Sequence, residues 1–260
     1  MKRFLSLVAA AMVLSSCGSL NLDPQRLMQS GAYAMQALTL TDAQVREYVH
    51  QYVTQMDAQS TVLPENNAYT KRLRKLTAGL DGVNEVPLNF KVYQEKEVNA
   101  FACADGSVRV YTGIMDAMTD NELLGVIGHE IGHVALNHTR RQMRNAILTS
   151  AALEGLASTS TTVAALTDSQ LGAIGSAMLD AKFSRDQESE ADDYGYNFLV
   201  KGGKNPWGMV MSFEKLQKLS NGSGQGGGLS NLFSSHPDTA TRIARMTQRC
   251  NTDGYKRPAK

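Results

Sequence analysis

The sequence predicts an α+β domain that is mostly helical and contains one small β-sheet. Apolar residues recur at helical spacing in several stretches, and two short segments are rich in β-prone residues. A turn signal lies between extended segments in the same region. Such a pattern is typical of helices packed beneath a small sheet.

Length and charge fit one domain that does not bind nucleic acid. The chain has 260 residues, of which 26 are basic and 25 acidic. After loss of a leader, about 220 residues would remain, which lies within the single-domain range. The net charge of +1 lacks the positive excess of nucleic-acid-binding domains. We therefore assign residues 41–260 to one domain.

The N-terminus has the pattern of a secretory signal. Lys2 and Arg3 precede an apolar run at 4–14 and then small residues. The run is too short to cross a membrane as a stable helix. We expect residues 1–16 to be removed.

The end of this signal resembles the lipobox of bacterial lipoproteins. The string Leu14-Ser15-Ser16-Cys17 predicts lipid attachment at Cys17, and residues 17–40 then form a lipid-anchored tether. Stable attachment needs more than one acyl chain. By resemblance, Gly18 after the cysteine favours transport to the outer membrane. The alternative is a secreted protein in which Cys17 is incidental.

Two amphipathic helices are predicted at the start of the domain. The first begins at Asp42, and the second follows the break at Pro64. Their apolar residues are Val45, Val49, Tyr52, Val53 and Met56 in the first helix and Leu73, Leu76 and Leu80 in the second.

Extended structure is predicted next. Residues 89–93 and 108–111 are β-prone, and Ala104-Asp105-Gly106 is a turn signal. An ordinary hairpin would account for the turn.

A long helix is predicted over residues 120–138. Its apolar residues recur at helical spacing, and Thr119 with Glu122 forms a capping-box pattern at its start. We expect His138 to end the helix, because cations favour helix C-termini. The alternative is that His138 supports a neighbouring site.

This helix contains the most informative motif of the chain, His129-Glu130-Ile131-Gly132-His133. Residues i and i+4 share a helix face, so both histidines can direct a ring nitrogen at one zinc ion. Glu130 can then flank a water on that ion, as in zinc-dependent hydrolysis. The alternative is a buried helix whose histidines only hydrogen-bond in the core.

A catalytic zinc takes three protein ligands and leaves a fourth position open, so a third ligand is needed. A second helix, beginning after Ser184 and ending at Gly202-Gly203, supplies candidates. Glu188 and Asp192 lie one turn apart, so one can bind the metal while the other accepts a ring N–H. The pattern alone does not rank Glu188 above Glu190. An acidic first turn that complements the helix dipole would also explain Asp186 and Glu190.

Two further segments, one between these motifs and one after them, admit two interpretations each. Residues 146–178 lack 18 consecutive apolar residues and are not a transmembrane helix; they form a helical hairpin over the cleft or a surface that touches lipid. The Gly/Ser-rich segment 220–230 leads into His236. It is a flap that brings His236 to the metal as a regulatory fourth ligand, or a flexible surface loop.

The strings HEIGHVALNH and, about fifty residues later, FSRDQESEAD resemble the HtpX-like, CAAX-prenyl-protease family of zinc metalloendopeptidases. The resemblance implies a gluzincin-type domain with Glu188 as third ligand and Asp192 as the closing Asp of the family string. It also implies that an edge strand at Asn99-Ala100-Phe101-Ala102, beside the HExxH helix, pairs with an extended substrate. Ser235-His236-Pro237, followed by Arg242, resembles the late His-Pro string of the family.

These features predict a zinc endopeptidase of the bacterial outer membrane that faces the periplasm. Glu130 acts as general base, and Asp192 orients a metal ligand. A description of the family can nevertheless count Asp192 among the catalytic residues. The expected partners are misfolded envelope proteins, outer-membrane lipid, and assembly or protease partners in that membrane. The alternatives are a latent protease that acts as a chaperone or assembly factor, and a hydrolase of a non-peptide substrate.

Three cysteines are present. If Cys17 carries lipid, Cys103 and Cys250 are the pair left for a disulfide in an oxidising compartment. The alternative is that Cys103 is a small apolar residue beside a strand.

Overall fold

The computed structural model describes residues 41–154, 168–180, 182–222, 236 and 239–259. The predicted signal peptide (1–16), the tether (17–40) with Cys17, and most of the Gly/Ser-rich segment lie outside the described residues. The helices are α2 (Asp42–Gln59), α3 (Ala68–Leu76), α4 (Thr112–Ala117), α5 (Asp120–Ala135), α6 (His138–Glu154), α7 (Asp168–Asp180), α8 (Arg185–Lys201), α9 (Trp207–Gly222) and α11 (Thr239–Thr252). The strands are β1 (Gly82–Val83), β2 (Val86–Pro87), β3 (Asn89–Tyr93), β4 (Ala100–Ala102) and β5 (Ser107–Tyr111). The predicted α+β class, mostly helical with little sheet, is confirmed.

The main sheet has three strands in the order β3-β5-β4. β3 pairs parallel with β5, and β4 pairs antiparallel with β5 through the predicted turn at Ala104-Asp105-Gly106. Gly106 has a φ of 86°, which suits glycine in that turn. β4 is therefore an edge strand of the described sheet, and β5 is its centre.

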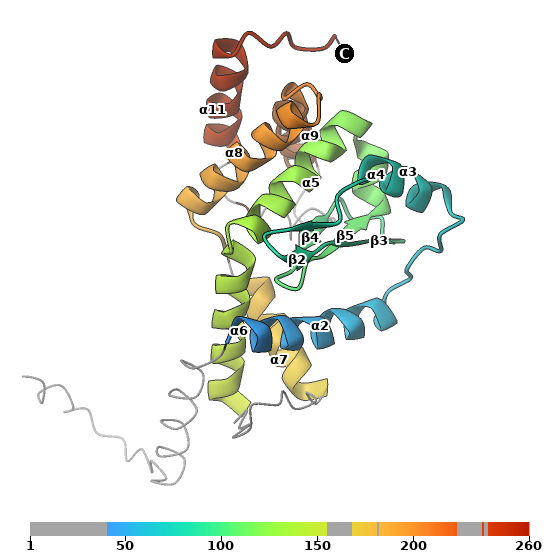
Figure 1. The fold of residues 1–260 in the computed structure, drawn as a ribbon, viewed down its shortest axis with the longest axis vertical. Helices are drawn as coiled ribbons and strands as arrows, with labels where there is room; N and C mark the ends of the chain where they lie inside the picture. Colours follow the sequence, from blue (N-terminus) through green and yellow to red (C-terminus); the bar gives the residue numbers. More distant parts are fainter. Residues whose placement is uncertain (1–40, 155–167, 181, 223–235, 237–238, 260) are drawn as a thin grey trace, which may run out of the picture.

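The HExxH helix α5 lies between the sheet and the pair α8 and α9 (Figure 1). A capping box between Thr119 and Glu122 begins it as predicted. Its residues from Glu122 to Ala135 are buried, because β4, α8 and α9 cover it on different sides. This burial places the motif in the main core, where a polar side chain needs a partner.

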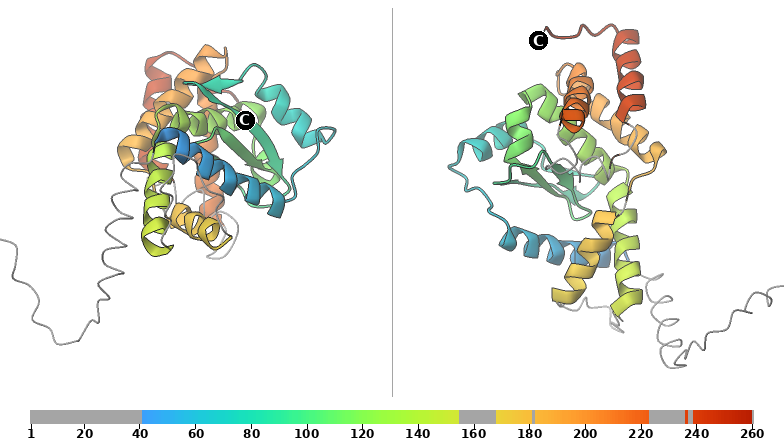
Figure 2. Two further views of the ribbon diagram at one scale, coloured as in Figure 1. Left: turned by 60° about the horizontal axis from the view of Figure 1, so that its bottom comes forward. Right: turned by 180° about the vertical axis from the view of Figure 1, so that it is seen from behind.

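The helices α2, α6 and α7 form a second layer at the opposite side of the sheet from α8, α9 and α11 (Figure 2). They enclose a separate cluster of buried residues: Val45, Tyr48, Val49, Val53, Cys103, Ala104, Met143, Ile147 and Ile174. The segment 146–178 thus contributes to two packed helices, with 155–167 outside the described residues. None of the helices in the described part is both long and apolar enough to cross a membrane.

Two sequence-based expectations about this region are wrong. The predicted helix 120–138 ends at Ala135, because Asn137 takes a φ of 60° that a helix cannot contain, and His138 begins α6. The disulfide is absent: Cys103 and Cys250 are free, buried thiols in different core clusters. Cys103 instead packs as a small apolar residue.

Candidate metal centre

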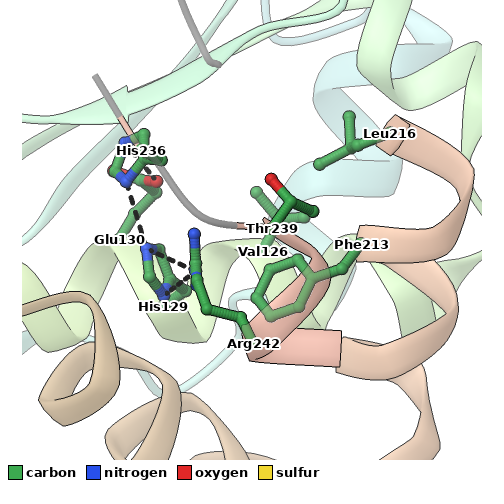
Figure 3. A pocket seen from close by; sticks show the side chains of 8 residues that line it. All are labelled: Val126, His129, Glu130, Phe213, Leu216, His236, Thr239 and Arg242. Carbon is green, nitrogen blue, oxygen red and sulfur yellow. Dashed lines mark hydrogen bonds and ion pairs between the residues drawn. The ribbon is translucent and has the colours of Figure 1, made fainter. Parts of the chain in front are cut away.

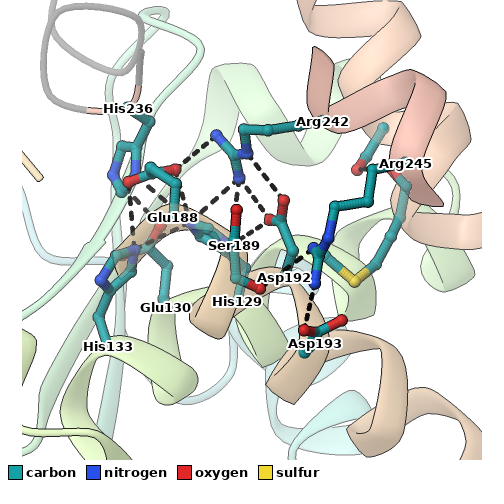
Figure 4. Close-up of polar contacts among 12 residues, drawn as sticks. His129, Glu130, His133, Glu188, Ser189, Asp192, Asp193, His236, Arg242 and Arg245 are labelled. Carbon is teal, nitrogen blue, oxygen red and sulfur yellow. Dashed lines mark hydrogen bonds and ion pairs between the residues drawn. The ribbon is translucent and has the colours of Figure 1, made fainter. Parts of the chain in front are cut away.

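Four buried side chains from three parts of the chain converge on one another (Figure 4). They are His129 and His133 on α5, Glu188 on α8, and His236. Their nitrogen and oxygen atoms lie within 4.8 Å of one another, and all four residues are buried. The sequence-predicted ligand set is thus brought together, including His236 from more than a hundred residues away.

The distances suit a tetrahedral metal ion. His129 Nε2 lies 3.0 Å from His133 Nε2 and 3.3 Å from His236 Nδ1, and His236 Nδ1 lies 2.9 Å from Glu188 Oε1. Zinc bonds of about 2.0–2.1 Å in a tetrahedron separate neighbouring ligand atoms by about 3.3 Å. Three imidazoles and one carboxylate also match the ligand types that zinc accepts.

The close contact of α5 and α8 makes this convergence possible. A Cβ at Gly132 would lie 3.0 Å from Tyr194 Cβ, and a Cβ at Gly195 would lie 3.0 Å from the backbone nitrogen of His129. Glycine at these two positions lets the helix backbones approach closely. Glu188, one turn into α8, therefore reaches the histidines of α5.

Glu188 has an ion-pair partner but retains one oxygen without a hydrogen bond. Its Oε2 is buried and accepts no well-directed hydrogen bond, although Arg242 Nη1 lies 2.5 Å away. Buried carboxylate oxygens are normally satisfied, so this oxygen fits a metal ligand. Glu190, which the sequence did not separate from Glu188, has a side chain that is 59% exposed and lies outside the cluster.

Asp192 lies beneath His129. Its Oδ1 is 3.0 Å from His129 Nδ1, which leaves His129 Nε2 directed at the cluster. Arg242 holds the same carboxylate with two hydrogen bonds, from Nε at 2.9 Å and from Nη2 at 2.6 Å. Its guanidinium also lies over the Phe213 ring, 4.4 Å from the centroid. Asp192 is therefore fixed in position rather than free to rotate.

His133 has different neighbours. Its Nδ1 lies 3.1 Å from His138 Nδ1, and Phe183 stacks on its ring at a centroid distance of 3.8 Å. His138 Nε2 lies 2.9 Å from Glu190 Oε2. The expectation that His138 only ends a helix is wrong: the break at Asn137 turns its fully buried ring toward His133.

Glu130 projects beside the cluster without belonging to it (Figure 3). His236 Nε2 lies 3.7 Å from its Oε1. A cavity of about 30 Å³ adjoins it, lined also by Val126, Phe213, Leu216, Thr239 and Arg242. Burial raises the pKa of Glu130 above its ordinary value, although a backbone hydrogen bond from Ala102 opposes this.

Burial and the buried charges set the other protonation states. Burial lowers the pKa of His133 well below its usual range, so its ring is neutral at pH 7. For Glu188 and Asp192, burial alone would raise the pKa. His236, His133 and His129 together outweigh burial at Glu188, and Arg242 and His129 together outweigh it at Asp192. Both pKa values are therefore lowered, and both groups are carboxylates. A neutral imidazole and an ionised carboxylate are the forms that bind metals.

The sequence matches the profile of peptidase family M48 over residues 64–250. It is also 44% identical to metalloprotease LoiP of Escherichia coli K12 over 250 residues, which are 96% of each chain. The chain belongs to peptidase family M48. This M48 protein is a metalloendopeptidase, and the expected family is confirmed.

Two other relatives of this M48 peptidase are also named as proteases. Metalloprotease YcaL of Escherichia coli K12 is 39% identical over 95% of this chain and 96% of its own. The beta-barrel assembly-enhancing protease of Escherichia coli O157:H7 is 31% identical over 64% of this chain but only 35% of its own length. The last similarity is thus to one part of a longer protein.

The edge strand of this M48 peptidase lies beside the candidate metal centre. Ala100, Phe101 and Ala102 form β4, which packs on α5, and Asn99 precedes it. The backbone hydrogen bond from Ala102 to Glu130 joins the strand directly to the site. The predicted substrate strand is thus adjacent to the candidate base.

The sequence analysis did not identify Arg242 as part of this site, and it assigned His138 the wrong role. Arg242 had been noted only as following the His-Pro string, yet it touches Glu188, Asp192 and His129. A buried arginine six residues after His236 gives no local signal of those contacts. Support of a neighbouring site was only the alternative for His138, because the apolar pattern does not reveal the break at Asn137 that turns its ring toward His133.

Proposed function

We propose that this M48 metalloendopeptidase is a zinc enzyme of the bacterial cell envelope. His129, His133 and Glu188 hold one zinc ion, and Glu130 is the general base. The observation that carries this proposal is the four-atom cluster within 4.8 Å, with the Glu130 carboxylate beside it. Glu188 is buried and ionised, and its Oε2 accepts no hydrogen bond, which suits a metal ligand.

Zinc, when bound, supplies a Lewis acid that polarises a carbonyl and makes water more acidic. Glu130 takes the proton of the attacking water and passes it to the leaving amine. Its raised pKa suits a group that both accepts and donates a proton, because that role needs a pKa nearer the working pH. Ala102 orients the Glu130 carboxylate through its backbone N–H.

Asp192 acts through His129 rather than on the substrate. Its carboxylate accepts the Nδ1 proton of His129 and thereby presents Nε2 to the metal. Arg242 keeps Asp192 ionised and oriented through its two hydrogen bonds. We therefore place Asp192 as a positioning residue and not as the proton donor of the reaction.

The substrate is an extended polypeptide bound along β4. An edge strand has unpaired backbone groups, and addition of a substrate strand satisfies them with little demand on sequence. Such recognition selects chains that are already unfolded. Misfolded or mis-assembled envelope proteins are the natural substrates on this basis.

The place of action follows from the N-terminal sequence. The lipobox at Leu14-Ser15-Ser16-Cys17 anchors the mature chain in the outer membrane through a lipid on Cys17, facing the periplasm. Partners in outer-membrane assembly fit this location, and one relative has the name beta-barrel assembly-enhancing protease.

A second function is favoured by the position of His236. Its Nδ1 lies at the fourth corner of the cluster, where water would bind in an open site. A chain held in this state is a latent protease and can serve as a chaperone or assembly factor until His236 leaves.

Metal removal and restoration test the proposal. The purified protein is dialysed against a zinc chelator, and casein cleavage is followed before and after addition of one equivalent of zinc. We expect casein cleavage to stop when zinc is removed and to resume when zinc is added back. The three ligands have no catalytic role without the metal that they hold. Full activity of zinc-free protein would refute the zinc mechanism.

A further inference from the structure

The ring of His138 contacts the Nδ1 atom of His133, on the side of that ring away from the cluster. Its ring is fully buried, and its two nitrogens point in different directions. Nδ1 lies 3.1 Å from His133 Nδ1, and Nε2 lies 2.9 Å from Glu190 Oε2. The three residues therefore form a chain of contacts that leads from the exposed Glu190 to the cluster.

The positions of the protons in this chain follow from the metal-binding role of His133, so the inference rests on the proposed function. A histidine that binds a metal through Nε2 is neutral and carries its proton on Nδ1. His133 must then donate from Nδ1 to His138 Nδ1, which has to be an acceptor. A neutral His138 carries its proton on Nε2, where Glu190 accepts it.

We infer that His138 and Glu190 are positioning residues that hold His133 in its metal-binding tautomer. Glu190 fixes the proton of His138 on Nε2, and His138 Nδ1 in turn accepts the proton of His133. No other arrangement of the neutral rings satisfies both short contacts when His133 Nε2 faces the metal.

The two zinc-binding histidines are thus held in different ways. His129 donates to the carboxylate of Asp192, which Arg242 neutralises. His133 donates to an imidazole and reaches a carboxylate only through it. Because Glu190 is 59% exposed, water can replace part of its effect, whereas nothing replaces the buried acceptor on His138.

Zinc affinity of two His138 variants separates a tautomer role from a packing role. His138→Phe keeps the ring volume but removes the acceptor. His138→Asn loses volume but places an amide oxygen near the position of Nδ1. We expect Phe to weaken zinc binding about 10- to 100-fold, the range for outer-shell partners, and Asn to weaken it less. A residue that only packs would give the reverse order.

Glu190→Ala is expected to weaken zinc binding by a smaller factor, about 2- to 5-fold, because water replaces the carboxylate. Asp186→Ala, on the exposed first turn of the same helix, is the matched control and should leave zinc affinity unchanged. Competition with a coloured zinc chelator gives these affinities, and thermal unfolding of the zinc-free variants verifies that each is folded.

Long-range ¹H–¹⁵N spectra of the zinc-loaded protein test the proton positions directly. The chain has five histidines, so the ring signals can be assigned by single substitutions. We expect the His138 proton on Nε2 and the His133 proton on Nδ1. A His138 proton on Nδ1, or equal zinc affinity in His138→Phe and wild type, would overturn the inference. If the wild type itself binds no zinc, the proposed function fails instead.

Discussion

His236 places its Nδ1 2.9 Å from Oε1 of Glu188, a residue 48 positions earlier in the chain. The same nitrogen lies 3.3 Å from His129 Nε2, so His236 completes a cluster of four candidate ligand atoms. A zinc ion with four protein ligands has no place for water. We propose that this arrangement is a closed site, which opens when His236 moves away from the other three residues.

Replacement of His236 tests this closed state. We expect His236→Ala to raise basal casein cleavage about tenfold while zinc content stays near one per chain, because three ligands suffice for a catalytic site. Cleavage of fluorescently labelled casein gives the rate, and atomic absorption gives the metal content. Unchanged or lower cleavage with normal zinc would contradict an inhibitory role for His236.

Asp192→Asn distinguishes positioning from proton donation. The amide cannot balance the buried charge of Arg242 and accepts the His129 proton less strongly, so we expect zinc affinity to fall about 10- to 100-fold. At saturating zinc, much of the cleavage rate should return. A variant with wild-type zinc affinity and a permanently lost rate would instead assign proton transfer to Asp192.

The stability of the fold should depend on pH through Asp57. Burial acts to raise the pKa of this carboxyl, but hydrogen bonds from Arg109, Lys91 and Tyr93 outweigh it and lower the pKa to about 2. A group with a lowered pKa in the fold stabilises it above the unfolded pKa of about 3.8, and this stabilisation is lost as pH falls toward 2.

We therefore expect Asp57→Asn to lower the free energy of unfolding by about 3 kcal/mol at pH 7, because Arg109 is left buried without a counter-charge. The difference from wild type should shrink between pH 4 and pH 2, since Asp57 becomes protonated in both states. Urea unfolding at several pH values measures this difference in the free energy of unfolding. A difference that is the same at pH 7 and pH 2.5 would exclude Asp57 as the titrating group.

Much of the site was predictable from the sequence because its signals are local. The i, i+4 spacing of His129 and His133 fixes their common helix face, and the capping box at Thr119 fixes where that helix begins. The strand and turn signals likewise predicted β3, β5 and the turn at Gly106. Each of these features depends on neighbours within a few residues.

The remaining features depend on how distant elements pack. The helical pattern did not rank Glu188 above Glu190, and only the family resemblance favoured Glu188. In the structure, the packing of α8 on α5, which is close at Gly132 and Gly195, brings Glu188 to the histidines. The role of Arg242 depends on where α11 lies, and neither α9 nor α11 was predicted. The small hairpin of β1 and β2 was missed for a different reason, because its two strands have only two residues each.

Zinc content and casein cleavage, measured together for wild type and Glu130→Gln, test the metalloprotease mechanism most directly. The substitution leaves all three proposed ligands in place, so both proteins should bind about one zinc. Only wild type should cleave, with the variant slower by at least about 100-fold, because it has lost the general base. Equal cleavage by both proteins would contradict the assignment of Glu130, and zinc binding without cleavage in either would favour the latent or chaperone function.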